Sequence, residues 1–568
     1  MAQASPSHFS SFLLILLIFA LSLGQQTTAG HGLSIKEATI DDLQLAFKHN
    51  KLTSRQLVQF YLGEISKLNP FLKGVIEVNP DALYLADKAD YERKTKAPSV
   101  SLSKLHGIPI LVKDNIATKD KLNTTAGSYA LLGSVVPRDA GVVTKLRKAG
   151  AIILGKASLS EWVYGRSNET PPGWSGRGGQ GVNPYNFNAT PSGSSSGSAI
   201  SAAANLAAVT LGTETDGSIL SPSSWNSVVG IKPTIGLTSR AGVGPVSPRQ
   251  DTVGWLPFSV SLFVGGVGLN RPIARTVSDA AYVLDVIAGI DSSDLATIEA
   301  SRYIPKGGYA QFLRPDGLRG KRIGIVRALF NFGGDASLAR TFEQHFNTLR
   351  KRGAVLVDNL EIAHFDEIYY NSSSESIALA AEFKIYLNTY LKNLVASPVR
   401  SLADVIAFNN KNSKLEKVKE YGQGRLLEAE ATNGIGNAEK AALVNLAKLS
   451  KNGFEKLVTK KRLDAVVAPS AAVSTLLAIA GSPGVVVPAG YTKDGVPFGI
   501  SFGGLRGSEP KLIEIAYGFE QATKIRKPPS LKKLQDLEPH FIGLGFFFTV
   551  LDPVGKKYVR FRHYNHYP

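Results

Sequence analysis

The sequence predicts an α/β layered fold. Short apolar runs, as expected of buried strands, alternate along the chain with segments that have the apolar spacing of helices. Such alternation is typical of domains in which helices cover a sheet. The chain has 568 residues, of which 43% are hydrophobic, and neither a repeat nor a long linker is evident, so one large compact domain is the simplest organisation.

Helices are predicted from capping signals and apolar spacing. Thr39 with Asp42, and Thr53 with Gln56, have the spacing of capping boxes, and each pair opens an amphipathic run. The N-terminal layer is therefore expected to be helical. Further helices are expected at residues 140–149, 198–208, 277–288, 336–351, 376–394 and 510–523. Strands are expected at residues 75–78, 108–112, 151–154, 207–211, 228–231, 322–326, 465–468 and 485–487.

Residues 1–29 are expected to form a secretory signal peptide. Residues 9–23 are almost wholly apolar, and Thr27, Thr28 and Ala29 offer a cleavage site. The apolar stretch is short for a membrane span, so no stable span is expected. An uncleaved anchor is the alternative, because no Lys or Arg precedes the apolar stretch. The expected localisation is secreted or endomembrane, with Asn123, Asn168, Asn188 and Asn371 as glycan acceptor motifs. Burial near the active site is the alternative for Asn123 and Asn188.

Composition excludes several classes of site. The chain has no cysteine, so neither disulfides nor thiolate metal sites contribute, and no histidine pattern has metal-binding spacing. Neither a metal nor a cofactor is therefore expected. The formal net charge is +18, but much of it is scattered lysine, which favours a solvated surface over nucleic-acid binding. A non-catalytic basic protein that binds polyanions is the alternative.

Lys113 is a candidate general base. It follows the apolar run 108–112, so we expect it at the mouth of a buried strand. Removal from water disfavours the charged ammonium and lowers the pKa of a lysine, which lets the neutral amine accept a proton. The alternative is a lysine at a strand end with its ammonium in water.

Two serine-glycine clusters supply candidate hydroxyl groups. Ser194 lies in a Gly/Ser run between Pro191 and an alanine-rich helix, which favours a fixed loop over a flexible linker. Ser218 follows Gly217 in a turn after the strand that ends near residue 211. Such a turn can direct successive backbone N–H groups at one point and stabilise a negative oxygen. A lysine and two serines suggest serine hydrolysis without histidine.

The chain resembles the amidase signature family over about residues 35–530. The matching segments are 107–115 (GIPILVKDN), 124–128 (TTAGS), 193–199 (GSSSGSA), 212–219 (GTETDGSI), 230–234 (GIKPT), 236–240 (GLTSR), 275–280 (RTVSDA) and 497–502 (PFGISF). The resemblance implies a single α/β/α domain around a large mixed sheet. It implies an amidase that releases ammonia or an amine and a carboxylic acid from a small-molecule amide.

The resemblance also assigns roles by motif position. Ser218 would be the nucleophile, Ser194 the bridging serine on a cis peptide bond, and Lys113 the base. The oxyanion would be held by the N–H groups of Thr215, Asp216, Gly217 and Ser218. Many family members have Gly-Gly where this chain has Asp216-Gly217, which places it nearer the plant and bacterial subgroup that includes peptide amidases.

Two segments depart from the family pattern. Residues 255–271 interrupt a run that is usually continuous, and residues 534–568 extend beyond it. The first segment is interpreted as a retained intron or a gene-model error, with an added hairpin over the active site as the alternative. The tail has no obvious place in the fold. The predicted organisation is a signal peptide (1–29), an amidase domain (30–533) and an atypical C-terminal tail (534–568).

Weaker motifs leave alternatives. Residues 193–197 also fit G-x-S-x-G, which would make Ser195 the nucleophile of a Ser-His-Asp hydrolase, but that motif requires a strand directly before it. Residues 176–181 fit G-x-G-x-x-G without a preceding strand, so a loop on the substrate side is favoured over a nucleotide site. An amidotransferase A-like protein, working on aminoacyl-tRNA together with partner proteins, is a further alternative. The sequence predicts neither the particular amide nor the oligomeric state.

Overall fold

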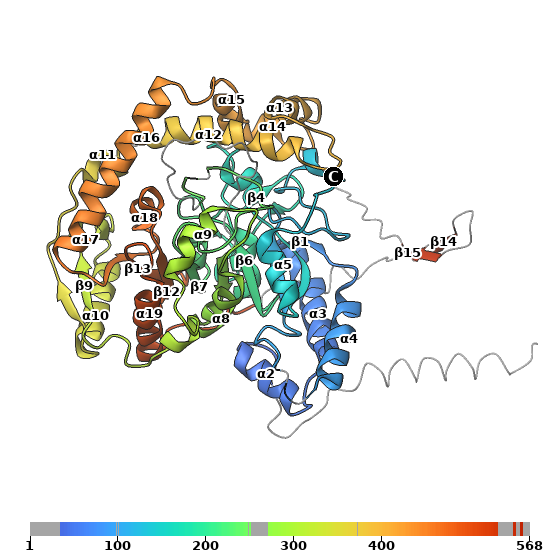
Figure 1. The fold of residues 1–568 in the computed structure, drawn as a ribbon, viewed down its shortest axis with the longest axis horizontal. Helices are drawn as coiled ribbons and strands as arrows, with labels where there is room; N and C mark the ends of the chain where they lie inside the picture. The colour runs from blue at the N-terminus through green and yellow to red at the C-terminus, as the bar shows by residue number, and fades with distance from the viewer. Residues whose placement is uncertain are drawn as a thin grey trace, which may run out of the picture.

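A mixed eleven-stranded sheet forms the centre of the molecule (Figure 1). The computed structural model describes residues 34–97, 99, 101–247, 249–251, 271–371, 373–531, 549–551 and 557–559. The strand order of the sheet is β1-β3-β2-β6-β8-β7-β12-β13-β11-β9-β10. Its strands are β1 (Val75–Val78), β2 (Pro109–Lys113), β3 (Ile152–Ala157), β6 (Val209–Gly212), β7 (Val229–Lys232), β8 (Arg271–Ala274), β9 (Arg322–Ile325), β10 (Val355–Val357), β11 (Ala465–Pro469), β12 (Gly484–Tyr491) and β13 (Pro497–Gly503).

The sheet contains both parallel and antiparallel pairs, and the antiparallel pairs lie together in its middle, with one more at the β1 edge. Strand β2 pairs in parallel with β3 and β6, and β9 pairs in parallel with β10 and β11. The pairs between β6, β8, β7, β12, β13 and β11, and the pair of β1 with β3, are antiparallel. Among the described residues, two further strand pairs lie outside the sheet: β4 (Trp174–Ser175) pairs with β5 (Gly179–Gln180), and β14 (Thr549–Leu551) pairs with β15 (Lys557–Val559).

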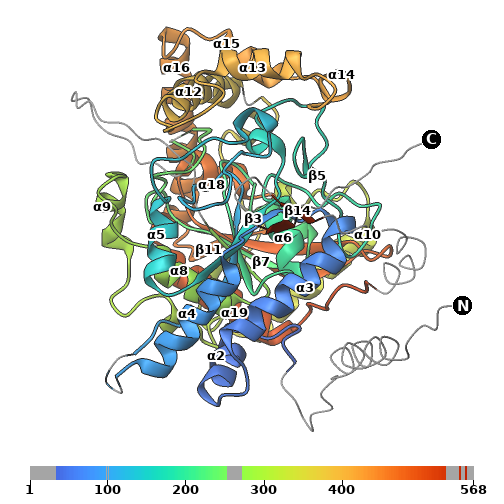
Figure 2. The ribbon, with the colours of Figure 1, turned by 90° about the vertical axis from the view of Figure 1, so that its right-hand side faces the viewer.

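Helices cover both faces of the sheet, which gives the α/β/α architecture that the resemblance implies. The helices are α2 (Ile40–Lys48), α3 (Ser54–Leu72), α4 (Ala82–Thr95), α5 (Gly141–Lys148), α6 (Ser196–Ala203), α7 (Leu220–Trp225), α8 (Val277–Ile287), α9 (Ala296–Ala300), α10 (Ala336–Lys351), α11 (Phe365–Tyr369), α12 (Ser373–Lys392), α13 (Leu402–Lys411), α14 (Val418–Tyr421), α15 (Gly424–Glu430), α16 (Asn437–Ser450), α17 (Lys456–Lys460), α18 (Ser474–Ala480) and α19 (Glu509–Thr523). Helices α12 to α16 gather at the end of the molecule opposite α2, α3 and α4 in both views (Figures 1 and 2).

Strand β2 shows how the core is divided. All five of its residues are buried. The Leu111 side chain packs in a cluster with α2, α3 and α4, whereas Ile110 and Val112 pack in a second cluster with α5, α8 and α19. Successive side chains therefore enter opposite faces, as strand geometry requires. Because both faces are covered, Lys113 at the end of this strand lies deep in the protein.

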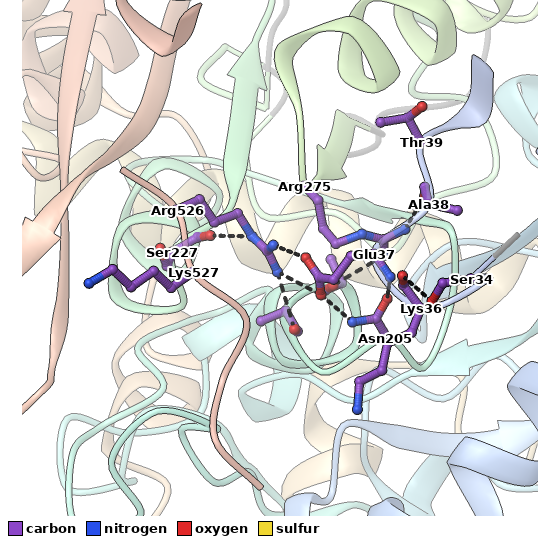
Figure 3. A network of polar contacts seen from close by, with 12 residues as sticks. Ser34, Lys36, Glu37, Ala38, Thr39, Asn205, Ser227, Arg275, Arg526 and Lys527 are labelled. Carbon is purple, nitrogen blue, oxygen red and sulfur yellow. Dashed lines mark hydrogen bonds and ion pairs between the residues drawn. The ribbon is translucent and has the colours of Figure 1, made fainter. Parts of the chain in front are cut away.

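A polar network ties the N-terminal segment to the chain that follows α19 (Figure 3). The Arg526 guanidinium pairs with the Glu37 carboxylate and donates to the Ser227 carbonyl at 3.0 Å. The Glu37 N–H donates to the Asn205 side-chain oxygen at 2.9 Å. Arg275 donates to the Ala38 carbonyl at 2.7 Å. These contacts hold the segment before α2 against the middle and the end of the domain.

Most predicted elements are present. Both capping boxes are formed, and each of the six further predicted helices and eight predicted strands has a counterpart close to its expected bounds. Helix α6 ends earlier than predicted, because Asn205 adopts φ 57° and turns the chain. Strands β8, β10 and β13 were not predicted; β13 contains Gly499 and Gly503, which weaken a strand signal.

Several predicted segments lie outside the described residues. These are the signal peptide, most of the 255–271 segment and most of the tail after residue 533. Within the part of the chain that the structure describes, no helix has the length and apolar character needed to cross a bilayer.

Candidate active site

Lys113 is completely buried, with an exposed fraction of 0%. Its Nζ donates to Ser194 Oγ at 2.7 Å, to Thr213 Oγ1 at 2.8 Å and to Ser195 Oγ at 3.0 Å. The alternative of an ammonium in water is therefore wrong. Strand β2 delivers the side chain into a polar pocket whose hydroxyl groups can accept from an ammonium or donate to a neutral amine.

Ser194 lies beside the lysine in the loop before α6. The Gly193–Ser194 peptide bond is cis, and the Ser194 side chain is 1% exposed. Its carbonyl accepts a hydrogen bond of 3.0 Å from the Ser160 N–H. Ser194 thus contacts the lysine through its hydroxyl while its backbone is held by another loop.

Ser218 lies in the turn between β6 and α7. Gly217 has φ 71°, a left-handed conformation that glycine adopts without steric cost. The Glu214 carboxylate accepts from the N–H groups of Ile219 and Leu220 at 2.7 and 3.0 Å, which fixes the far side of the turn. The Ser218 carbonyl accepts from the Ser195 N–H at 3.1 Å, so the two serine clusters are joined directly.

Both serine clusters open onto one cleft of about 780 Å³. Ser194 and Ser218 line it together with the candidate oxyanion residues Thr215, Asp216 and Gly217. The opposite wall comes from α12 and α15 and from the turn at residues 163–165. The lining residues from these parts are Val163, Tyr164, Gly165, Glu375, Ser376, Leu379, Ala380, Phe383, Arg425, Glu428 and Ala429. The structure therefore brings together every site residue that the sequence predicted, with Lys113 in contact with Ser194 and the rest at the cleft.

Two acidic side chains face this cleft from different elements. Asp216 Oδ2 accepts from Thr475 Oγ1 at 2.8 Å, which joins the Ser218 turn to α18. Burial raises the pKa of Asp216. Burial, and then the charge of Asp216, raises the pKa of Glu375 to about 7. Glu375 could not be predicted from the sequence, because it comes from a helix more than 150 positions after the Ser218 turn.

Ser195 is placed unlike a hydrolase nucleophile. It is 0% exposed, does not line the cleft, and donates to the Thr213 carbonyl at 2.9 Å. No strand directly precedes it, so the structural requirement of the G-x-S-x-G motif is not met. No described histidine forms a hydrogen bond with it.

The glycine motif at residues 176–181 also has a different place from the one expected. It forms the turn and second strand of the β4-β5 hairpin, and none of its residues lines the cleft. The Gly176 N–H donates to the Glu161 carboxylate at 2.6 Å. The prediction of a substrate-side loop is therefore wrong, because the hairpin packs on buried polar groups instead. Among the described residues, no cluster of three His, Asp or Glu side chains has the arrangement of a metal site.

Known proteins are similar to most of this chain. The Amidase family model matches residues 56–513, which is most of the chain. The chain belongs to the amidase family. It is accordingly an enzyme that hydrolyses amide bonds.

Several amidases are similar over nearly their whole length. A probable amidase of Arabidopsis thaliana is 58% identical, with 90% of this chain and 95% of the relative covered. A putative amidase of Schizosaccharomyces pombe is 37% identical, with coverages of 88% and 87%. Among solved structures, the peptide amidase of Stenotrophomonas maltophilia is 42% identical with a TM-score of 0.77, covering 87% of this chain and 98% of that one. This amidase thus has the fold of its solved relative and is matched by these relatives over most of its own length.

Proposed function

We propose that this amidase acts through Ser218 as nucleophile, Ser194 as proton relay and Lys113 as base. The observation that carries the proposal is the 2.7 Å contact between Lys113 Nζ and Ser194 Oγ at the floor of the cleft that Ser218 also lines. Complete burial disfavours the charged ammonium form of Lys113. A lysine can act as a base only in its neutral form, so burial favours this role.

The proposed reaction has two stages. Ser218 attacks the amide carbonyl while its proton passes through Ser194 to Lys113. The tetrahedral oxyanion is held by the N–H groups of Thr215, Asp216, Gly217 and Ser218. The C–N bond then breaks and the proton returns through Ser194 to the departing ammonia or amine. Water, activated by the same relay, attacks the acyl-enzyme and releases the carboxylic acid.

The proposed substrate is a carboxamide with a large acyl group. A cleft of about 780 Å³ falls in the range of roughly 300–1,000 Å³ that holds a drug-sized ligand, and it exceeds what a simple amide fills. Apolar side chains such as Leu379, Ala380 and Phe383 line its α12 wall. The similarity to a peptide amidase supports a peptide-like acyl group. Amides of increasing acyl size should show rising kcat/KM, and a constant kcat/KM would contradict this assignment.

Single alanine variants test the proposed roles. Ser218→Ala should lower kcat by about 10⁶-fold, as loss of a hydrolase nucleophile does. Ser195→Ala is the comparison in the other serine cluster: it removes one hydroxyl group that contacts Lys113 but keeps Ser218 and Ser194, so it should lower kcat far less than Ser218→Ala does. A steady-state amide hydrolysis assay in which Ser195→Ala is inactive and Ser218→Ala is active would overturn the assignment in favour of the Ser-His-Asp alternative.

The amidotransferase alternative has less support. A glutamyl-tRNA(Gln) amidotransferase protein of Thermoanaerobacter pseudethanolicus is 30% identical, against 58% for the Arabidopsis amidase. The described part of the chain offers no specific observation in favour of a tRNA substrate.

We propose a secretory or endomembrane location from the apolar leader at residues 9–23. Three acceptor asparagines, Asn168, Asn188 and Asn371, are exposed, and Asn123 is half-buried against Glu77. The alternative that Asn188 is buried is therefore wrong. Treatment of the natively expressed protein with a glycosidase should increase its gel mobility, and a protein with an intact leader and no glycan would contradict the proposal.

A further inference from the structure

Three charged side chains are buried behind the wall of the cleft and take no part in the proposed proton relay. The side chains of Arg166, Glu161 and Glu416 are all 0% exposed. Arg166 Nη1 lies 2.7 Å from Glu161 Oε1 and 3.4 Å from Glu416 Oε2. Arg166 also donates to the Glu416 carbonyl, and to the Gly422 carbonyl at 3.0 Å. Buried charges of this kind are tolerated only where they are paired and hydrogen-bonded.

The trio of Arg166, Glu161 and Glu416 has no net charge if its two carboxyl groups together hold one proton. Two carboxylates and one guanidinium would leave a net negative charge without water around it. Both carboxyl groups face Gly176, where a β-carbon would lie 2.7 Å from a Glu416 oxygen and 3.1 Å from a Glu161 oxygen. Carboxyl groups that share a site in this way cannot both ionise readily.

The surroundings favour retention of this proton. Burial, and then the charge of Glu416, raises the pKa of Glu161 to about 8, and burial raises the pKa of Glu416. Arg166 is the cation that opposes both shifts. The other groups that contact the carboxyl pair are neutral donors from the neighbouring elements, namely Gly176 N–H, Ser128 Oγ and Tyr129 N–H.

Glu161 and Arg166 enclose a strained turn that lines the cleft. Trp162, Val163 and Tyr164 have φ values of 51°, 60° and 72°. This left-handed region is unfavourable for residues other than glycine, and most of all for a β-branched residue such as Val163. Surrounding contacts must therefore hold the turn, and a buried ion pair joins the residues on either side of it.

The residues next to this trio contact both sides of the cleft. On one side, the Ser160 N–H, next to Glu161, donates to the Ser194 carbonyl at 3.0 Å. On the other side, Glu416 precedes α15, whose Arg425 donates to the Tyr164 carbonyl at 2.8 Å. The chain therefore has one continuous set of contacts from the α15 wall, through the strained turn, to the loop of Ser194.

We propose that Arg166 is a positioning residue that holds the turn at residues 162–164 and the α15 wall around the cleft, while Glu161 and Glu416 share one proton that balances its charge. This inference rests on the proposed function only in taking the cleft as the place where the amide is hydrolysed.

Glutamine variants test the charge balance. Glu161→Gln or Glu416→Gln alone leaves one carboxylate for Arg166, so each should keep kcat/KM at pH 7 within about 3-fold of the parent enzyme. The double variant leaves a buried guanidinium with no carboxylate from the trio. It should lose about 10-fold or more in kcat/KM, chiefly through KM, for an amide with a large acyl group. A double variant as active as the single variants, or single variants that each lose as much as the double, would overturn the proposal.

Thermal unfolding against pH tests the shared proton without an activity assay. In the folded protein Glu161 keeps its proton up to about pH 8, whereas in the unfolded chain it loses the proton above its usual pKa. Its contribution therefore lowers the stability of the parent as the pH rises from 5 to about 8. The Tm of Glu161→Gln should therefore rise relative to the parent over that range. Glu37→Gln is the control: the pKa of Glu37 is lowered in the folded protein, so its Tm difference from the parent should not grow over that range.

The two tests separate this proposal from the proposed function. Equal pH dependence of Tm in the parent and in Glu161→Gln would refute the shared proton, whatever Ser218 does. An active Ser218→Ala variant would refute the catalytic assignment and leave the pH dependence of Tm unchanged.

Discussion

At the scale of single residues, the proposed chemistry depends on a buried amine and on the conformation of one glycine. Lys113 contacts Ser194 at the end of a strand that is covered on both faces. Gly217 precedes Ser218 and has φ 71°, and a β-carbon there would lie 3.1 Å from Ser474 Oγ. The direction of the N–H groups in this turn therefore requires a residue without a side chain.

Gly217→Ala should impair catalysis more than stability. The alanine strains the left-handed backbone, costing about 1–2 kcal/mol of unfolding free energy, and displaces the proposed oxyanion donors. Loss of one such donor typically lowers kcat by about 10²–10³-fold. Gly133→Ala is the matched control, since Gly133 has φ 81° but open space around its β-position. Comparable kcat values for the two variants, at comparable losses of stability, would count against the oxyanion role.

At the scale of elements, the N-terminal helices are attached by side chains as well as by apolar packing. Helices α2, α3 and α4 share an apolar cluster with β2 and β3. Glu37, just before α2, pairs with Arg526 beyond α19 (Figure 3). Burial works to raise the pKa of Glu37, but the charges of Arg526 and Arg275 and the hydrogen bonds outweigh it, so the pKa lies below its usual value.

Glu37→Gln should destabilise the protein in a pH-dependent way. A carboxylate whose pKa is lowered by folding contributes stability above its unfolded pKa, and this contribution is lost as the pH falls through the folded pKa. We expect a loss of about 1–2 kcal/mol at pH 7 that shrinks as the pH falls below the usual pKa of a glutamate, measured by urea unfolding. Glu299→Gln in the exposed pair with Arg302 should change little. A deficit for Glu37→Gln that is the same at pH 3 and pH 7 would contradict this role.

At the scale of the whole molecule, the cleft is built from distant parts of the chain. Its floor comes from loops at the ends of central strands, and its opposite wall comes from α12 and α15 at one end of the molecule (Figure 2). The sequence predicted the floor well, because a strand-end lysine and two glycine-serine turns are local patterns. The capping boxes of α2 and α3 were predictable for the same reason.

The other parts of the cleft and its surroundings could not be predicted, because they depend on tertiary contacts that no local pattern specifies. Arg166 and Glu416 are 250 positions apart, and nothing near either residue indicates that they meet. The left-handed turn at residues 162–164 contains no glycine, so propensity alone gives no signal for it. Glu375 and the other residues of the α12 wall face the cleft only because the helix packs across it. Tertiary packing decides these features, and sequence periodicity does not report it.

We infer that Ser218, activated through Ser194 by Lys113, carries the acyl group. The most direct measurement is tandem mass spectrometry of the full chain after reaction with a fluorophosphonate that labels activated serines. We expect a single labelled residue, Ser218, and loss of this labelling in the Lys113→Ala variant. Labelling at Ser195, or labelling of Ser218 that is unaffected by loss of Lys113, would contradict it.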